Sequence, residues 1–459
     1  MALQYDAPTP AADLTAALEA NPTISANTLA AISSLLNLDT VSTAVVASWD
    51  GIAADVTAPA GQVADLVAVS VEGTTATTLT LPDSVADAKV VIVDTDADIT
   101  LTVGSDLSTV ARAAFVAEPT DRIVVTGNGD DTVTLLGDDN VTVDTGNGND
   151  TIVTGAGDDV VYAGNGNDTI TTGQGKDVID GGAGRDVVIV EGDSVDFTPS
   201  LSLNGKTLYL NGDTSTISLQ NTEFVSFADG HSLSIVANET EATALRLYDG
   251  LLGRDADNGG AEAFTTAVAG GESLSSIANT FLTSTEYTTN LNEGYVESLY
   301  SSLLGRDADE GGEAAFLNAL ANGATRAEVA ASIATSDEAQ TANLSDTDYV
   351  NSLYENGLGR TSDLQGLDAY TNLLAHGGTR AEVADQILGS SEATYKANSD
   401  FVTSLYTQAL GREADADGKA NWISALEHGV SQADVAIGIV GSPEAHDHST
   451  NVVVIAGQV

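Results

Sequence analysis

Apolar and polar residues follow a strict rhythm in the middle of the chain. Between Thr145 and Ile189 one nine-residue phrase recurs five times, reading TGNGNDTIV, TGAGDDVVY, AGNGNDTIT, TGQGKDVID and GGAGRDVVI. Its glycines permit a tight turn, and it ends in a short strand with one inward apolar residue. The inward residues are Ile152, Val161, Ile170, Ile179 and Val188. Two phrases therefore predict one 18-residue coil of two short strands and two turns.

Each phrase also places one Asp inside its turn, and the five Asp residues step by nine without a slip. Turns then stack on alternate sides of the coil, which brings Asp150, Asp168 and Asp186 into one column. Like charges this close repel unless a cation lies between them. Ligands that are all oxygen, many of them backbone carbonyls, favour calcium. A Gly- and Asp-rich β-solenoid without metal is the alternative.

Two less regular phrases precede the five, TGNGDDTVT from Thr126 and LLGDDNVTV from Leu135. Asp131 and Asp150 are 19 residues apart, which is two phrases with one inserted residue. We expect one or two further ions here, through Asp131 with Asp150 and Asp139 with Asp159. The predicted lead-in site also includes the glycines of the Asp131 turn, Gly127 and Gly129.

Strand-like patterns precede the repeats. Residues 43–125 contain KVVIVD at 89–94 and ITLTV at 99–103, and they predict a metal-free β-helix or β-sandwich that leads into the repeats. In the N-terminal segment 1–42, residues 9–38 predict two short helices.

Strand-like patterns also follow the repeats. Residues 194–238 predict a β cap in which Phe224 and Phe227 cover the open end of the solenoid. The cap is expected to contain hairpin turns at Asn204-Gly205 and Asn211-Gly212.

At Glu239 the pattern changes to that of helices, and a second, longer repeat begins. Its four opening phrases are RLYDGLLGRDAD, SLYSSLLGRDAD, SLYENGLGRTSD and SLYTQALGREAD. They predict an all-α array of four small helical units, followed by a tail. The units are 239–292, 293–345, 346–398 and 399–445, and the tail is 446–459.

One Arg holds the same place in every unit, and an Asp follows it three residues later. The pairs are Arg254 with Asp257, Arg306 with Asp309, Arg360 with Asp363, and Arg412 with Asp415. We favour a structural role, in which Arg caps carbonyls at a helix C-terminus and pairs with the Asp. A set of anion sites for acidic or phosphorylated glycans is the alternative. Arg326 and Arg380 fit the first turn of a helix and are expected to face solvent.

The charge balance excludes several classes of function. The 459 residues include 15 Lys plus Arg and 67 Asp plus Glu, a net charge of −52, so binding to nucleic acid or to an anionic membrane is not expected. The absence of Cys excludes disulfides and thiolate chemistry. No run of about 18 apolar residues predicts a transmembrane helix.

Common enzyme motifs are absent from the sequence. The five His residues never form H-E-x-x-H and no G-x-S-x-G is present, so we expect no catalytic residues. Acidic pairs are too numerous for a glycosidase pair to be recognised, which leaves a hydrolase as a weaker alternative. His446, Asp447 and His448 could bind a transition metal, but a flexible tail is the better interpretation.

The nine-residue phrase resembles the RTX repeat, G-G-x-G-x-D-x-U-x, over about residues 126–190, and the RTX roll is predicted over 126–193. The first Gly of that pattern is Thr or Ala in four of the five phrases. The resemblance implies a right-handed parallel β-roll in which each calcium ion lies between two turns and takes an Asp and two carbonyls from each. The implied first site is Gly146, Gly148, Asp150, Ala163, Asn165 and Asp168. The second is Gly164, Gly166, Asp168, Gly181, Ala183 and Asp186, and the third is Gly155, Gly157, Asp159, Thr172, Gln174 and Asp177.

The helical units resemble a domain of unknown function that commonly follows RTX rolls in secreted bacterial proteins, on the pattern LY-x-x-x-LGR-x-x-D. This resemblance covers about residues 240–445 and implies no catalytic chemistry. Related helical modules in bacterial S-layer proteins help to attach the layer to surface polysaccharide.

Together the resemblances imply a secreted structural protein that folds with calcium and assembles with itself into an S-layer, sheath or filament. Export through a type I system is implied, because the apolar end Asn451–Val459 fits an uncleaved signal of such a system. The same segment fits a strand donated to a neighbouring molecule. The alternative function is a secreted adhesin whose helical units hold a glycan, with cell-surface polysaccharide as the partner.

Overall fold

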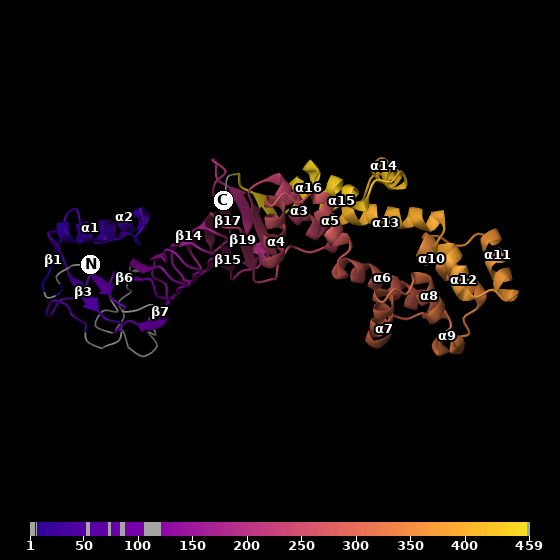
Figure 1. The fold of residues 1–459 in the computed structure, drawn as a ribbon, viewed down its shortest axis with the longest axis horizontal. Coiled ribbons are helices and arrows are strands. Elements are labelled where there is room, and N and C mark those ends of the chain that lie inside the picture. Colours follow the sequence, from indigo (N-terminus) through magenta and orange to yellow (C-terminus); the bar gives the residue numbers. More distant parts are fainter. Residues whose placement is uncertain are drawn as a thin grey trace. The chain divides into compact units, whose positions relative to one another are not determined.

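The structure is a computed structural model that describes residues 5, 7–51, 56–71, 75–82, 88–104 and 121–456. The chain divides into two compact units. Unit 1 contains Met1–Asn238 with Asn451–Val459, and unit 2 contains Glu239–Thr450. Unit 1 is built mainly of strands and unit 2 of helices (Figure 1). A β-roll followed by an all-α array, as predicted, is confirmed.

Unit 1 is a stack of coils whose strands form two long sheets. The ten-stranded sheet contains, in spatial order, β16 (Thr198–Leu201), β17 (Leu208–Asn211), β18 (Thr216–Gln220), β14 (Lys176–Ala183), β12 (Val160–Asn165), β10 (Val141–Asp144), β8 (Arg122–Gly127), β6 (Val90–Thr95), β4 (Leu66–Val69) and β3 (Val46–Trp49). The nine-stranded sheet contains β21 (Val452–Val454), β20 (Ser232–Val236), β19 (Phe224–Phe227), β15 (Val187–Val190), β13 (Thr169–Thr172), β11 (Thr151–Val153), β9 (Thr132–Leu136), β7 (Ile99–Gly104) and β5 (Thr77–Thr80).

Within the repeats, neighbouring strands pair in parallel with partners 18 residues apart. Val161 pairs with Ile179, and Ile152 pairs with Ile170, so the single apolar residue of each phrase stacks on that of the next coil. All four side chains are fully buried. The predicted 18-residue coil is confirmed, and the burial of one apolar side chain per strand holds such short strands together.

The described part of the region before the repeats continues the same stack. β4 pairs in parallel with β6, β6 with β8, and β8 with β10. One apolar ladder runs from Val67 through Val91 and Val124 to Val143. Of the two expected architectures this is the β-helix, because strands of a β-sandwich are antiparallel.

Two short helices cover the opposite face of the ten-stranded sheet, as predicted for residues 9–38. They are α1 (Ala11–Glu19) and α2 (Ala26–Leu35), and the short pair β1 (Thr9–Pro10) and β2 (Thr43–Ala44) flanks them. Leu14, Leu18 and Ile32 are buried in one cluster with Val90 and Ile123 of the sheet. Because side chains alternate along a strand, Val90 and Ile123 point to the face opposite the apolar ladder that contains Val91 and Val124.

The cap extends both sheets beyond the last repeat. After a short 3₁₀ helix, η1 (Ser194–Asp196), β16 and β17 form an antiparallel hairpin whose turn contains Gly205 at φ +67°. β18 then returns to pair in parallel with β14, and β19 pairs in parallel with β15. Phe224 and Phe227 are buried, as expected for residues that cover the end of the coil.

The segment after unit 2 rejoins unit 1. β21 pairs in parallel with β20, with Ser234 opposite Val452, and the amide of Ile455 donates to the carbonyl of Val236 at 2.8 Å. The Ile455 side chain is buried in the core of unit 1. The apolar segment is therefore a strand added to the chain's own sheet, and residues 457–459 lie outside the described part.

Unit 2 consists of short helices that recur along the chain. In order they are α3 (Glu239–Leu247), the π-helix η2 (Tyr248–Leu252), α4 (Asn258–Ala269), α5 (Leu274–Leu282), α6 (Thr285–Leu304), α7 (Glu310–Ala321), α8 (Arg326–Ala334), α9 (Asp337–Thr341), α10 (Asp346–Leu358), α11 (Leu364–Ala375), α12 (Arg380–Leu388), α13 (Ser391–Leu410), α14 (Ala416–Glu427), α15 (Gln432–Val440) and α16 (Pro443–His448). His446, Asp447 and His448 thus end a helix, and the expectation of a flexible tail at these residues was wrong.

The repeated helices of unit 2 pack in two pairs. α8 packs against α12, and α5 packs against α15. In the first pair Val329 and Ile333 share one buried cluster with Val383 and Ile387. These four helices hold equivalent positions in the four predicted repeats. The contact of α8 with α12 joins the second repeat to the third, and the contact of α5 with α15 joins the first repeat to the fourth.

Replacement of Ile455 by Ala should destabilise unit 1, because a buried side chain is removed from the sheet end. We expect a loss of about 2–4 kcal/mol in the free energy of unfolding, measured by denaturant titration with circular dichroism. Val454→Ala, one residue earlier at the end of β21, is the control and should cost less, since Val454 is only half-buried. Equal losses in the two variants would contradict the docking of this strand.

Candidate metal centre

One column of acidic residues runs along a single side of the roll. Its contacts repeat from coil to coil, because the backbone amide of each Asp donates to the carboxylate of the Asp in the next coil. The distances from N to Oδ1 are 2.8 Å for Asp131 to Asp150, 2.8 Å for Asp150 to Asp168 and 2.9 Å for Asp168 to Asp186. The predicted column therefore exists, and it includes Asp131 despite the inserted residue.

A second, shorter column lies on the alternate side. The amide of Asp159 donates to Oδ1 of Asp177 at 3.1 Å, as predicted for these two phrases. The predicted pairing of Asp139 with Asp159 is wrong, because Val141 stands opposite Asp159 and its amide donates to Oδ1 of Asp159 at 3.0 Å. The extra residue falls at the end of β9, so the next phrase begins at Leu136 and its Asp position is Val141.

All six column residues are buried, with exposed fractions of 0–1%. In each of them Oδ1 accepts a backbone hydrogen bond, whereas Oδ2 is buried without any hydrogen-bond partner. An unpaired buried carboxylate oxygen is costly, and six in one solenoid call for a compensating charge. They are Asp131, Asp150, Asp159, Asp168, Asp177 and Asp186.

The electrostatics agree with this geometry. Burial raises the pKa of Asp131, Asp168 and Asp177 to about 6, and of Asp150 and Asp186 to about 7. Burial also raises the pKa of Asp159. Backbone hydrogen bonds act in the opposite direction, and neighbouring carboxylates such as Asp168 beside Asp150 raise the pKa further.

The carbonyl groups predicted to bind calcium belong to turns that are stacked closely, because backbone hydrogen bonds join one turn to the next. In the first predicted site the amide of Asn165 donates to the carbonyl of Gly146 at 2.8 Å, and the amide of Gly148 donates to the carbonyl of Asn165 at 2.8 Å. The carbonyl of Ala163 accepts from the Thr145 hydroxyl at 3.0 Å. In the second, Gly166 donates to Ala183 at 2.8 Å, Gly164 pairs with Gly182, and Gly181 lies against Asp186. In the third, Gly157 donates to Gln174 at 2.9 Å and Gly155 accepts from Gly173 at 3.1 Å. In the lead-in turn, Gly127 accepts from Asn147 at 3.2 Å and Gly129 donates to Asn147 at 2.8 Å.

Glycine is required in these turns for a steric reason. Gly166 has φ +139°, and a Cβ on it would overlap the carbonyl oxygen of Gly148 in the turn below. Gly148 stands in the same relation to Gly129. The turns can therefore stack at the spacing of a parallel sheet only where the side chain is missing.

Threonine hydroxyls form a feature of these turns that the sequence analysis did not single out. The Oγ1 atoms of Thr126, Thr154 and Thr172 are buried and make no hydrogen bond in the structure. Burial is the larger effect and raises the pKa of Asp177 and Asp159, but the nearby hydroxyl of Thr172 favours the charged form of Asp177 and acts in the opposite direction, as Thr154 does for Asp159. Unpartnered hydroxyl and carboxylate oxygens thus face the same interior of the turns.

The donor set of the columns suits a hard cation. Among the described residues, no three His, Asp or Glu side chains lie together as a ready metal cluster. A cation here would draw on two stacked carboxylates and on main-chain carbonyls, which is the mixture that calcium accepts. The orphaned Oδ2 atoms supply the negative charge, so the residues present fit this ion.

The four repeated arginines of unit 2 have a structural role. Nε of Arg254 donates to Oε1 of Glu286 at 2.6 Å, its NH2 group donates to Oε2 at 2.9 Å, and its guanidinium lies 4.9 Å from the ring centre of Tyr248. The guanidinium is also within 3.4 Å of Asp257. The same arrangement joins Arg306, Arg360 and Arg412 to Glu338, Glu392 and Glu444. The pairing with Asp is confirmed, and the Glu partners were missed.

These contacts count against the anion sites that were the alternative. Each guanidinium faces two carboxylates, so an acidic glycan would meet a neutralised group. The expectation for the other two arginines is only half right. Arg326 is exposed, but Arg380 is half-buried, stacks 5.1 Å from the ring centre of Tyr349 and donates to the carbonyl of Leu344 at 2.9 Å.

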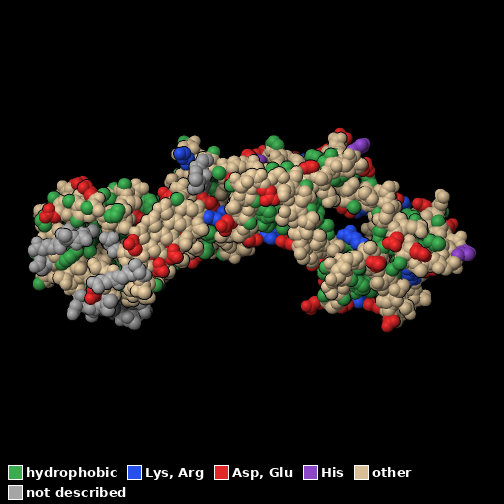
Figure 2. Space-filling model, viewed as in Figure 1, with side chains coloured by type: hydrophobic (Ala, Val, Ile, Leu, Met, Phe, Trp, Pro, Cys, Tyr) green, Lys and Arg blue, Asp and Glu red, His purple; other side chains and the backbone are tan. Residues whose placement is uncertain are grey.

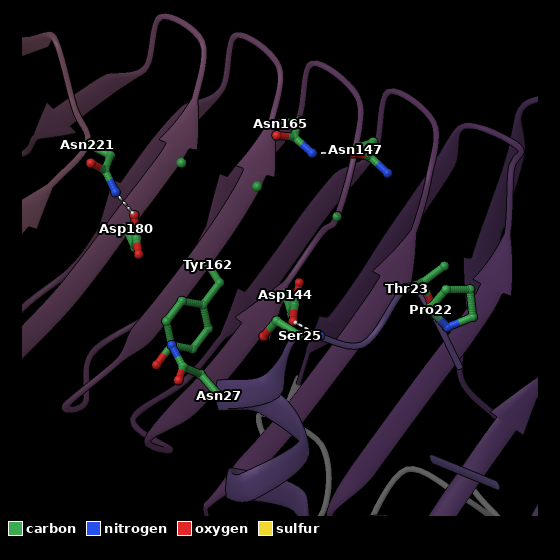
Figure 3. Close-up of a pocket in the computed structure, with 13 residues that line it drawn as sticks. Pro22, Thr23, Ser25, Asn27, Asp144, Asn147, Tyr162, Asn165, Asp180 and Asn221 are labelled. Carbon is green, nitrogen blue, oxygen red and sulfur yellow. Dashed lines mark hydrogen bonds between the residues drawn. The ribbon is translucent and has the colours of Figure 1, made fainter. Parts of the chain in front are cut away.

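A polar groove of about 360 Å³ lies between the loop before α2 and the ten-stranded sheet (Figure 3). On one side an amide row joins Asn165 to Asn147, and on the other Asn221 donates to Asp180 at 2.6 Å. Asp144 accepts from the Thr28 hydroxyl at 2.6 Å and from the amide of Ser25 at 3.2 Å, which fastens α2 to the roll. Tyr162 lines the same groove.

Comparison with known families identifies both repeat types. A family described as the RTX calcium-binding nonapeptide repeat (4 copies) matches residues 136–170, 144–179 and 153–188. A family described as a domain of unknown function (DUF4214) matches residues 278–343, 339–397 and 392–449. The chain carries RTX repeats followed by a DUF4214 region. No curated protein matches the chain.

The RTX repeats make the protein calcium-binding and indicate an extracellular protein of type I export. RTX and DUF4214 families are typically non-enzymatic. In the described part of the chain no helix has both the length and the apolar character needed to cross a bilayer.

The metal-free RTX region should be more stable at about pH 5 than at about pH 8, because its buried carboxylates hold protons that the unfolded chain has released. Burial raises the pKa values of five of them to about 6–7 in the folded state, against about 3.9 for an unfolded Asp, so this stability is lost as the pH rises through 6 and 7. The five are Asp131, Asp150, Asp168, Asp177 and Asp186. Thermal unfolding followed by circular dichroism in calcium-stripped buffer measures it.

Saturating calcium provides the control for the pH series. Protons compete with calcium for the same carboxylates, so the slope of melting temperature against pH should reverse when calcium is present. A metal-free melting temperature that rises with pH would contradict the assignment of the buried carboxylates.

Proposed function

We propose that the protein is a calcium-folded structural component of the bacterial cell exterior that assembles with copies of itself into an S-layer, sheath or filament. The observation that carries the proposal is the pair of buried acidic columns, in which every Oδ2 is unpartnered. Such a solenoid is unfavourable without a cation and becomes stable when one binds.

The proposed sites follow the stacked turns. Asp150 with Asp168, Asp168 with Asp186, and Asp159 with Asp177 would each hold an ion with the carbonyls of their turns. Asp131 with Asp150 would hold another. Calcium supplies positive charge between the stacked carboxylates, and the chain supplies oxygen ligands in fixed positions. At the low calcium concentration inside a cell the columns repel and the chain stays open, whereas millimolar calcium outside favours the fold.

Assembly is supported by the surface of the cap. β16 forms one edge of the ten-stranded sheet, and all four of its residues are exposed. Leu201 and Leu203 in the same hairpin and Val195 before it are exposed apolar residues. An exposed strand edge beside apolar side chains is a surface on which a second copy could pair. Figure 2 shows Asp and Glu side chains over the visible faces of both units. Contact between two copies is therefore favoured at surfaces that carry few of these acidic side chains.

Glycan binding by the helical units is the second candidate function. A cleft of about 520 Å³ among the helices of unit 2 is lined by Tyr287, Tyr295, Arg326, Asn290 and Gln408. Aromatic rings beside amide groups suit a polyhydroxylated ligand. This cleft, rather than the four neutralised arginines, is the place in unit 2 where a glycan would be sought.

Removal of calcium by a chelator should abolish most of the β signal that arises from residues 126–236 in circular dichroism. Asp168→Asn should raise the calcium concentration at the folding midpoint by about tenfold or more, since it removes one charge shared by two proposed sites. Asp158→Asn is the matched control and should leave the midpoint unchanged. Asp158 is exposed, and Asn149 and Asn167 hold the same place in neighbouring phrases.

Spectra that do not change with calcium would defeat the calcium-folding part of the proposal. A shift of the same size in both Asn variants would show that the charge as a whole, and not the column, controls folding.

Purified protein in calcium should form ordered sheets or fibres in electron microscopy, and Leu203→Asp in the exposed hairpin should weaken them. The physical reason is that a charge placed on the apolar hairpin opposes its burial between copies. Lys206→Glu on the same hairpin is a control for charge alone. Soluble monomers that are retarded in gels containing polysaccharide would support the glycan-binding alternative instead.

A further inference from the structure

The acidic column of the long side does not end at the last nonapeptide. β15 and β19 pair in parallel with Val187 opposite Phe224, so Glu223 stands opposite Asp186. In the two coils below, the same register places Asp186 opposite Asp168 and Asp168 opposite Asp150. Glu223 therefore occupies the Asp position of one more coil, although the hairpin of the cap separates it from the repeats in sequence.

The contact made by Glu223 repeats the contact made by each Asp below it. The amide of Asp186 donates to Oε2 of Glu223 at 2.7 Å, as the amide of Asp168 donates to Oδ1 of Asp186 at 2.9 Å. The amide of Phe224 donates in turn to the carbonyl of Asp186 at 3.1 Å. The cap is thus stacked on the last repeat in the same manner as the repeats are stacked on one another.

A main-chain carbonyl completes the arrangement. A side chain at Gly181 would collide with both the carbonyl oxygen of Asn221 and Oδ2 of Asp186, so both oxygens lie close to Gly181. Asn221 reaches this position with φ +47°, a left-handed conformation that is unfavourable for most residues. Its side chain is fixed by the hydrogen bond to Asp180 at 2.6 Å.

Asp186 is the buried charge at this point. Asp186 is fully buried, and its Oδ2 has no hydrogen-bond partner. The amide contacts place the carboxylates of Glu223 and Asp168 on either side of Asp186 in the column. The guanidinium of Arg185 lies 6.0 Å from the ring centre of Phe224, next to Glu223 in the chain. Arg185 is therefore the alternative to a metal ion as the positive charge that balances Asp186.

We propose that Asp186, Glu223 and the carbonyl of Asn221 hold a further calcium ion, at the junction between the repeats and the cap. The ligands are all oxygen, two of them carboxylates, as calcium prefers. This inference rests on the calcium-binding function proposed above and deepens it, because the ion would tie the order of the cap to calcium as well as the order of the repeats.

Counting calcium ions on the full chain by equilibrium dialysis tests the site. Glu223→Gln keeps an oxygen that can accept the Asp186 amide but loses the charge, and it should bind one ion fewer than the unchanged protein. Glu191→Gln, an exposed carboxylate at the end of β15, is the control and should keep the full number. Hydrogen exchange adds a local readout, since the amides of β19 should lose protection by about tenfold in Glu223→Gln while those of β11 do not.

Glu223→Lys covers the case in which Glu223→Gln does not fold. An ammonium group beside Asp186 takes the place of the ion, so this variant should also bind one ion fewer while the cap stays ordered. A full ion count in either folded variant overturns the inference and leaves Arg185 as the balancing charge. If the unchanged protein binds no calcium at all, the proposed function itself fails, which is a different result.

Discussion

The structure depends on the burial of like-charged carboxylates in two columns. Six Asp side chains lie in the interior of one solenoid, each with one oxygen paired to the backbone and one left without a partner. Close stacking of the turns, made possible by glycines such as Gly148 and Gly166, is what forces these charges together. The same stacking that builds the apolar ladder of Val161 and Ile179 therefore creates the electrostatic demand for a cation.

Three carboxylates elsewhere in the chain are paired with groups of the protein itself. Asp144 accepts hydrogen bonds from Ser25 and Thr28 at the start of α2, where the helix end favours negative charge. In unit 2, Glu286 and Glu338 receive the forked guanidinium groups of Arg254 and Arg306. In the columns of the roll, by contrast, one oxygen of each carboxylate has no hydrogen-bond partner from the described part of the protein, which is why a cation is proposed there and not beside the ion pairs.

Much of this arrangement could be predicted from the sequence, because a strict period of nine fixes both the coil and its register. The errors arose where the period fails. One extra residue at the end of β9 places Val141, and not Asp139, opposite Asp159. Glu223 was missed since a hairpin interrupts the repeat and Glu replaces Asp. The Glu partners of the arginines lie 32 residues away in sequence, beyond any local pattern.

Because β21 pairs with β20, unit 2 is an insertion in the chain between two neighbouring strands of the nine-stranded sheet of unit 1. A ribosome or an export channel delivers β20 well before β21, so the roll waits for its final strand until the whole helical unit has emerged. Both connections to unit 2 then leave from adjacent strands. A pulling force applied to the helical unit would be shared between two neighbouring anchors in the sheet, instead of peeling the roll open from a single loose end.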